Sequence, residues 1–221
     1  MRMRKKKHLE ERLSACSPVC LGWIPDAVHS EGLAEKIAPF SIFGNRAPLH
    51  LEIGCGKGKF ANTIAAQNPD INFIAVEQTA NVIVSAMEQT VQLGLPNLRY
   101  LMGKAEYLWK ITPPKSVERI YLNFSCPFPK KSYAKHRLTH ERFLDIYREI
   151  LTSDGVIVLK TDNPGFFEFS LNSLSDGGFR LRNITFDLHN SDITGNIITE
   201  YEQRFLSQGL PIYYTEALNS K

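Results

Sequence analysis

From residue 49 onward, short apolar runs alternate with stretches that have the spacing of amphipathic helices. The apolar runs predict seven strands, over residues 50–53, 72–77, 98–102, 119–123, 156–160, 179–186 and 212–216. Most of these runs are continuously apolar, which is typical of strands buried on both faces. Because parallel neighbours need a crossover and the intervening segments are helical, the pattern predicts an α/β fold. We expect a mostly parallel, twisted, seven-stranded sheet with helices on both faces.

The chain length of 221 residues fits a single domain overall, with a short N-terminal addition. Residues 1–45 are expected to form a basic arm and a lead-in, and residues 46–221 the α/β domain. The arm begins Met-Arg-Met-Arg-Lys-Lys-Lys-His, which indicates either a solvated terminus or a contact for a phosphate backbone. The net charge of +3 allows a nucleic-acid partner without requiring one.

Membrane and metal partners are not expected. No apolar run is long enough to span a bilayer, and the first residues lack the apolar region of a secretory signal. We therefore expect a cytoplasmic protein. The cysteines are Cys16, Cys20, Cys55 and Cys126, and because no two of them form a C-x-x-C pair, no metal site is expected.

A glycine-rich turn follows the first predicted strand. Glu52 lies near the end of that strand, and Gly54, Gly56 and Gly58 come before a predicted helix. Glycines let the backbone approach a ligand closely, and a helix N-terminus offers free amides. Ligands of open α/β sheets bind outside the carboxyl ends of the strands, so we expect a binding site at this turn.

Glu77 ends the second predicted strand and narrows the class of ligand. A carboxylate at this place accepts hydrogen bonds from a ribose diol, which both a dinucleotide and S-adenosylmethionine carry. Glu52 separates these ligands, because it repels a pyrophosphate and attracts the sulfonium and ammonium groups of S-adenosylmethionine. The two carboxylates therefore favour S-adenosylmethionine as the cofactor. NAD, a fold without catalysis, and ordinary surface carboxylates are the alternatives.

A loop that combines an aromatic residue with basic residues follows the fourth predicted strand. Pro127 and Pro129 stiffen this loop around Phe128. The basic side chains come next, at Lys130, Lys131, Lys135, His136 and Arg137. An aromatic ring beside basic groups suits a nucleic-acid base joined to phosphates, whereas the alternative is an ordinary solvated loop.

Several motifs together resemble the bacterial tRNA (guanine-N7-)-methyltransferases over nearly the whole chain. They are the glycine turn at 51–58, the segment 121–125 with the Pro-x-Pro-Lys-Lys that follows it, and the segments 137–139, 160–163, 187–191, 195–197, 199–202 and 209–213. The loop motif and the Thr-x-Tyr-Glu motif are much more specific than the glycines. The resemblance implies a Rossmann-like class I methyltransferase fold, S-adenosylmethionine as the cofactor, and tRNA as the partner of a monomer or homodimer.

The resemblance also implies a reaction and residue roles. The implied reaction transfers a methyl group to N7 of guanosine 46 in the variable loop of tRNA. Glu52 and Glu77, with the glycine turn, look like the family's cofactor contacts. Its substrate contacts are implied at Lys130, Lys131, Lys135, Arg137, Asp162, Thr199, Glu200, Tyr201 and Glu202. By spacing alone, Thr199 and Glu202 also fit a helix capping box.

Two positions depart from the family's pattern. Cys126 stands where the family usually has the Asp of Asp-Pro-Trp-Pro-Lys, a position assigned to cofactor binding or catalysis. Lys104 stands where the family has an Asp or Asn near the adenine, and a lysine offers no acceptor. Guanine N7 carries a free lone pair and no proton, so methyl transfer needs orientation rather than a general base. A nucleophilic role for Cys126 is disfavoured, because the reaction needs no covalent intermediate.

These departures motivate two other hypotheses about function. One is a tRNA-binding member of the same fold whose catalysis is weakened, since Cys126 and Lys104 replace usual carboxylate positions. The other is a methyltransferase that acts on a small molecule, against which the basic arm and the basic loop argue.

Overall fold

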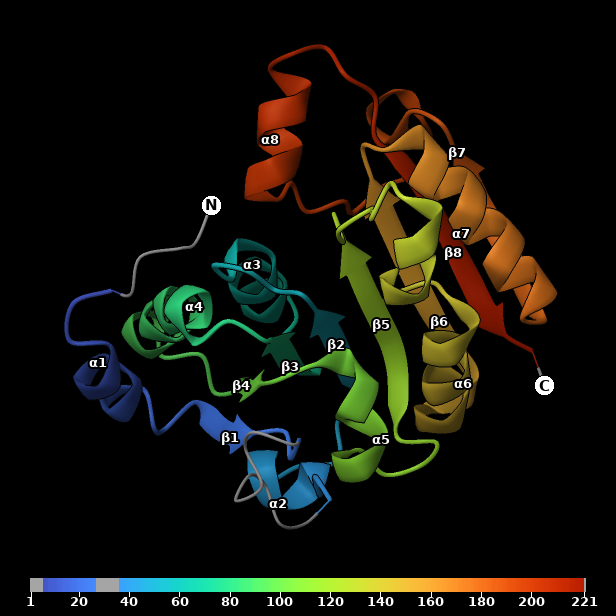
Figure 1. Ribbon diagram of the computed structural model, residues 1–221. Coiled ribbons are helices and arrows are strands. Elements are labelled where there is room, and N and C mark those ends of the chain that lie inside the picture. Colours follow the sequence, from blue (N-terminus) through green and yellow to red (C-terminus); the bar gives the residue numbers. More distant parts are fainter. Residues whose placement is uncertain (1–5, 27–35, 221) are drawn as a thin grey trace.

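The computed structural model describes residues 6–26 and 36–220. Within these residues the strands form one eight-stranded sheet in the order β1-β4-β3-β2-β5-β6-β8-β7 (Figure 1). The strands are β1 (Cys20–Trp23), β2 (Leu49–Ile53), β3 (Asn72–Glu77), β4 (Leu98–Met102), β5 (Val117–Asn123), β6 (Leu151–Thr161), β7 (Phe179–Thr185) and β8 (Tyr213–Asn219). Strands β1 to β6 pair in parallel, whereas β8 runs antiparallel to both β6 and β7. The mostly parallel α/β sheet is therefore confirmed.

Helices cover both faces of the sheet (Figure 1). The helices α3 (Lys59–Gln67) and α4 (Ala80–Leu93) lie on one face, and α5 (Leu108–Ile111), α6 (Glu141–Ile150) and α7 (Pro164–Asp176) lie on the other. Successive strand residues point to opposite faces, so each strand supplies both cores. In β3, Phe73 and Ala75 pack with α3 and α4, whereas Ile74 packs with α6 and α7. This double burial explains why the strand sequences are continuously apolar.

Part of the N-terminal segment packs on the sheet and on α4. Residues 20–23 pair with β4 as an eighth strand at the sheet edge, which the sequence pattern did not predict. The helix α1 (Leu9–Ala15) lies beside α4, where Arg12 donates to Glu88 at 2.6 Å. A four-residue strand with little periodicity owes its structure to this edge pairing, so local sequence gives no signal for it. The first five residues of the predicted basic arm lie outside the described residues.

The chain between β7 and β8 leaves the sheet and returns across its carboxyl edge. It carries the short η3 (Leu188–Asn190) and then α8 (Glu200–Leu206), which Figure 1 shows standing beyond the end of β5. Three other short helices lie in connections, namely α2 (Pro39–Phe43), η1 (Ala105–Tyr107) and η2 (Lys131–His136). Among the described residues, no helix combines the length and the apolarity that a bilayer span requires.

Candidate functional site

A cavity of about 570 Å³ lies at the carboxyl ends of β2, β3, β4 and β5. Four separate segments form its walls: the glycine turn after β2, the ends of β3 and β4, the loop after β5, and the start of α8. The cavity brings together many of the residues predicted from the sequence, including Glu52, Glu77, Lys104, Cys126, Glu200 and Tyr201. The cavity thus lies outside the strand ends, where the sequence predicts a binding site.

The glycine turn forms an open cradle at the start of α3. Gly54 and Gly56 have φ of 84° and 58°, and a Cβ at either position would meet no atom within 4 Å. The backbone there can approach a ligand because no side chain intervenes. Gly58 has a different reason to be glycine: with φ of 81°, a Cβ would lie 2.5 Å from the Ala86 Cβ of α4. The first two glycines leave space for a ligand, and the third allows α3 and α4 to pack.

Glu52 is a buried carboxylate with one oxygen left for a ligand. Its side chain accepts a hydrogen bond from Asn123 Nδ2 at 3.0 Å through Oε1, whereas Oε2 is buried without a partner. Burial raises the pKa of Glu52 to about 7, opposed by the Asn123 hydrogen bond and by the nearby cation of Lys160. A cationic ligand group at Oε2 would stabilise the ionised form.

Glu77 lies at the end of β3 on the adjacent wall. Its Oε1 accepts a hydrogen bond from the backbone nitrogen of Thr79 at 2.9 Å, which fixes the carboxylate at the mouth of the turn into α4. Glu77 is only half-buried and lines the same cavity as Glu52. The geometry therefore supplies two carboxylates to one ligand from neighbouring strands.

The loop after β5 holds its aromatic residues in an unusual backbone conformation. Phe124 and Phe128 have φ of 52° and 40°, which few residues other than glycine adopt. Arg137 holds this loop, because its guanidinium donates to the carbonyl oxygens of Pro127 and Phe128, each at 3.0 Å. The guanidinium also packs over the Phe169 ring at 4.4 Å. The structure thus gives Arg137 a part in shaping the loop, in addition to its predicted tRNA contact.

The first turn of α8 closes the cavity opposite this loop. Thr199 Oγ1 accepts from the Glu202 nitrogen at 3.0 Å, and Glu202 Oε2 accepts from the Thr199 nitrogen at 3.2 Å, which confirms the capping box. Thr199 and Glu202 are buried, whereas Glu200 and Tyr201 are exposed. The side chains of Thr199 and Glu202 thus bond within the chain, while Thr199, Glu200 and Tyr201 line the cavity. The tRNA contact at these four residues stays a prediction.

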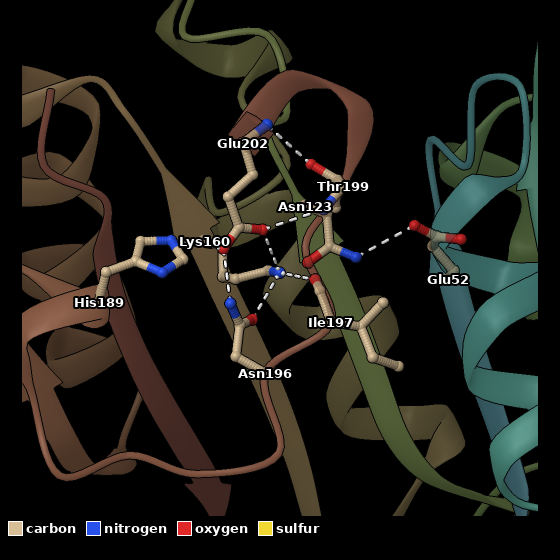
Figure 2. A network of polar contacts seen from close by, with 8 residues as sticks. All are labelled: Glu52, Asn123, Lys160, His189, Asn196, Ile197, Thr199 and Glu202. Atoms are coloured by element: carbon tan, nitrogen blue, oxygen red, sulfur yellow. Dashed lines mark hydrogen bonds and ion pairs between the residues drawn. The ribbon is translucent and has the colours of Figure 1, made fainter. Parts of the chain in front are cut away.

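Behind α8, Glu202 meets a buried lysine (Figure 2). Lys160, in β6, donates to Glu202 Oε2 at 2.8 Å, to the Ile197 carbonyl at 2.8 Å and to Asn196 Oδ1 at 2.9 Å. Burial lowers the pKa of Lys160, and Glu202 opposes that shift. Asn123 lies between this network and Glu52 (Figure 2).

Comparison with known proteins gives consistent matches. A family model described as "Putative methyltransferase" matches residues 46–215. A protein of Brevibacillus brevis named tRNA (guanine-N(7)-)-methyltransferase is 51% identical over 79% of this chain and 82% of its own length. A protein of the same name from Geobacillus thermodenitrificans is 44% identical over 99% of this chain and 97% of its own length.

The chain belongs to the tRNA (guanine-N(7)-)-methyltransferase family.

Solved structures support the fold of this methyltransferase. The 16S rRNA methyltransferase KamB superposes with a TM-score of 0.62 at 15% identity, covering 86% of this chain and 96% of that one. A SAM-dependent methyltransferase from Aquifex aeolicus gives 0.57 at 12% identity, covering 96% and 99%. Sequence identities this low show the fold alone, which is the class I methyltransferase fold.

The cavity fits S-adenosylmethionine, the cofactor of this methyltransferase. The unpartnered Oε2 of Glu52 provides a buried acceptor for the ammonium or sulfonium group of this cofactor, whereas it would repel the pyrophosphate of a dinucleotide. The open cradle at Gly54 and Gly56 admits a ligand close to the backbone. Glu77 is placed to accept hydrogen bonds from a ribose diol. These residues are the ones that would hold the cofactor.

The remaining predicted residues of the methyltransferase lie around the cavity. Cys126 and Lys104 are exposed and line it, so the thiol and the ammonium are both accessible to a ligand. Lys130, Lys131 and Lys135 are exposed on η2 and the residue before it. Asp162 follows the end of β6 and is half-buried. No group of His, Cys, Asp and Glu that could hold a metal occurs in the described part of the chain.

Three residues at or behind the site lie in segments that the sequence singles out, but their individual roles are not predicted. Asn123 holds Glu52, Lys160 holds Glu202, and Phe124 stacks on Tyr201 with ring centroids 6.4 Å apart. A polar residue that ends an apolar strand is a sequence signal for the first two. The Phe124 contact joins segments far apart in the chain, so no local pattern indicates it.

Proposed function

We propose that this methyltransferase transfers a methyl group from S-adenosylmethionine to N7 of guanosine 46 in the variable loop of tRNA. The observation that carries the proposal is a single cavity with two kinds of wall. Glu52, Glu77 and the glycine cradle form a cofactor wall, while Phe124, Phe128 and Tyr201 form an aromatic wall that opens onto exposed lysines. Such a cavity suits a flat base that enters from an RNA surface. As tRNA is the proposed substrate, we place the activity in the cytoplasm, in a monomer or homodimer.

Methyl transfer to N7 requires no proton transfer by the side chains around the base. When bound, S-adenosylmethionine supplies an electrophilic methyl group. The N7 lone pair of guanine is already free, so no residue has to remove a proton before the transfer. The residues then have to orient the base and exclude competing orientations. Such orientation can lower the activation free energy by several kcal/mol. The rigid loop around Phe124 and Phe128, held by Arg137, is suited to orientation.

The presence of Cys126 is compatible with this chemistry. Its thiol lines the cavity at the position where the family pattern has a carboxylate. Because no general base is required, backbone carbonyl groups of the loop can supply part of the hydrogen bonding that a carboxylate would give. The relatives that are 51% and 44% identical carry the name of the active enzyme, which favours catalysis over a weakened tRNA-binding role.

The tRNA surface is formed by the exposed lysines. Lys130, Lys131 and Lys135 follow the aromatic Phe128 on the same loop, so phosphates would lie beside an inserted base. Glu200 and Tyr201 face the cavity from the other side. Asp162 is proposed as a further substrate contact, on the family pattern alone.

Paired tRNA transcripts test the proposed target. Transcripts with guanosine or adenosine at position 46 are incubated with labelled S-adenosylmethionine and the purified enzyme. We expect label in the guanosine transcript and none in its partner. Equal labelling of both transcripts would show a different target nucleotide, and labelling of neither would contradict the proposal.

A further inference from the structure

The start of α8 forms a wall of the cavity, yet α8 lies outside the sheet and its helix layers. Glu200 and Tyr201 face the cavity, and the Tyr201 ring stacks on Phe124 with an angle of 20° between the rings. Phe205, one turn later in α8, stacks on the same Phe124 ring at 6.0 Å. The position of the aromatic wall therefore depends on what holds α8.

A buried charge pair holds the N-terminal turn of α8 to the sheet. The Lys160 side chain is 2% exposed and that of Glu202 is 0% exposed, and their charged atoms lie 2.8 Å apart. Lys160 also donates to Asn196 and to the Ile197 carbonyl, so one cation holds the approach to α8 as well as its first turn (Figure 2). An ion pair between Lys57 and Glu200 spans 3.7 Å between well-exposed side chains and is expected to contribute little.

The Glu202 carboxylate is bound by several donors of this chain. Its Oε2 accepts from Lys160 and from the Thr199 nitrogen, and its Oε1 accepts from Asn196 at 2.6 Å. His189 Nε2 lies 2.9 Å from Oε1, without the alignment of a hydrogen bond. The carboxylate is therefore buried among donors of this chain and holds the first turn of α8 in place.

We propose that Lys160 and Glu202 are positioning residues that dock α8, so that Tyr201 and Phe124 form the surface on which the target base stacks. Both side chains of the pair are buried, so their effect on a base would pass through Tyr201, which is 61% exposed. This inference rests on the proposed function for the identity of the base, whereas the docking of α8 does not. A base-stacking aromatic of this kind contributes measurably to the binding of an unpaired base.

Variants at Glu202 separate positioning from general stability. Glu202→Ala removes the partner of Lys160 but keeps the lysine near Glu52, whereas Glu202→Gln keeps an acceptor of the same shape. The readouts are KM and kcat for tRNA, the affinity for S-adenosylmethionine by calorimetry, and hydrogen exchange of residues 200–206 against residues 59–67. Arg182→Met is the control, because it breaks another ion pair, to Glu216 at 2.5 Å, between β7 and β8.

Glu202→Ala should raise KM for tRNA by roughly tenfold or more while cofactor affinity changes by less than about threefold. Exchange should become faster in residues 200–206 and stay unchanged in 59–67. Glu202→Gln should restore most of the KM for tRNA and of the exchange protection in residues 200–206. Arg182→Met should change neither of these two quantities. Unchanged exchange in α8 of the Ala variant, or parallel loss of cofactor and tRNA binding, would overturn the proposal. If the wild type methylates no tRNA, the proposed function fails, and the exchange data still decide the docking of α8.

Discussion

A single buried carboxylate, Glu52, connects the electrostatics of the cavity to its choice of ligand. Its Oε1 accepts from Asn123, and its Oε2 has no hydrogen-bond partner among residues 6–26 and 36–220. An unpaired buried oxygen of this kind is costly unless a ligand completes it. Oε2 of Glu52 is therefore suited to bind a cationic group, and S-adenosylmethionine carries such groups.

The pH dependence of cofactor binding should report Glu52. With the pKa of Glu52 raised to about 7 in the ligand-free protein, the ligand has to displace a proton at lower pH. Affinity for S-adenosylmethionine should then fall by about tenfold per pH unit below pH 7 and level off above it. Calorimetry between pH 5.5 and pH 8.5 measures this profile.

The raised pKa of Glu52 also makes the free energy of unfolding depend on pH. This free energy should fall as pH rises, whereas cofactor affinity should increase. Folding takes up a proton at Glu52, so its contribution to the free energy of unfolding is present below pH 4.5 and lost as pH rises to about 7. Glu52→Gln should remove this dependence and weaken cofactor binding by about 2 kcal/mol or more. Glu118→Gln, at an exposed position in β5, serves as the control. A flat affinity profile in the wild type would contradict the assignment.

Cys126 provides a second test at the residue scale. If the thiol acted as a general base or nucleophile, Cys126→Ala would lower kcat by about 10²–10⁴-fold. Because N7 carries no proton, we expect a loss smaller than about tenfold, measured by single-turnover methylation. Cys126→Asp restores the side chain of the family pattern and shows how much a carboxylate adds. A loss of 10²-fold or more in the Ala variant would assign Cys126 a chemical role.

At the scale of elements, the packing of α3 on α4 depends on one glycine. Gly58 needs both a positive φ and an absent side chain, since the Ala86 Cβ would lie 2.5 Å from an added Cβ. Gly94, which ends α4, also has a positive φ of 64° but faces open space. Alanine at position 94 would introduce backbone strain alone, whereas alanine at position 58 would introduce both backbone strain and steric overlap.

Gly58→Ala should destabilise the protein more than Gly94→Ala does. The strain of a positive φ costs about 1 kcal/mol in both variants, and overpacking adds about 1–3 kcal/mol at position 58 alone. Urea denaturation measures both free energies of unfolding. Equal losses would mean that α3 and α4 separate without cost and that the third glycine has no packing role.

The loop between β5 and α6 should show the salt dependence of a phosphate contact. Lys130→Ala should weaken tRNA binding and lower the slope of log affinity against log salt by roughly 0.7 to 0.9 for one lost phosphate contact. Filter binding over a range of salt concentrations measures that slope. Arg180→Ala, on the exposed side of β7, should leave it unchanged. A loss for Lys130→Ala that is independent of salt would argue against a phosphate contact.

The sequence predicts elements well where burial determines their pattern. The seven strands from β2 to β8 and the capping box at Thr199 follow from apolar runs and local chemistry. The strand β1 is not predicted from the sequence, because its structure comes from edge pairing with β4. The inward orientation of Glu202 is not predicted for a similar reason, since its partner Lys160 lies 42 residues away in the chain. Contacts between distant segments set such orientations, and local spacing does not record them.

Across the whole molecule, the parallel strands bring the cofactor carboxylates and the substrate loop to one edge. Glu52, Glu77 and the loop after β5 come from three strands that are adjacent in the sheet. The antiparallel β7 and β8 extend the sheet and carry between them the segment with α8, which completes the cavity. We therefore assign cofactor binding mostly to the first half of the chain and recognition of the base mostly to the second.

Nucleoside analysis after a single turnover tests this account most directly. Purified protein in excess is incubated with S-adenosylmethionine and an unmodified tRNA transcript that carries guanosine 46, and the RNA is digested to nucleosides. We expect stoichiometric 7-methylguanosine at that position, and its loss in the Glu52→Gln variant. A protein that binds both S-adenosylmethionine and tRNA yet forms no 7-methylguanosine would contradict it.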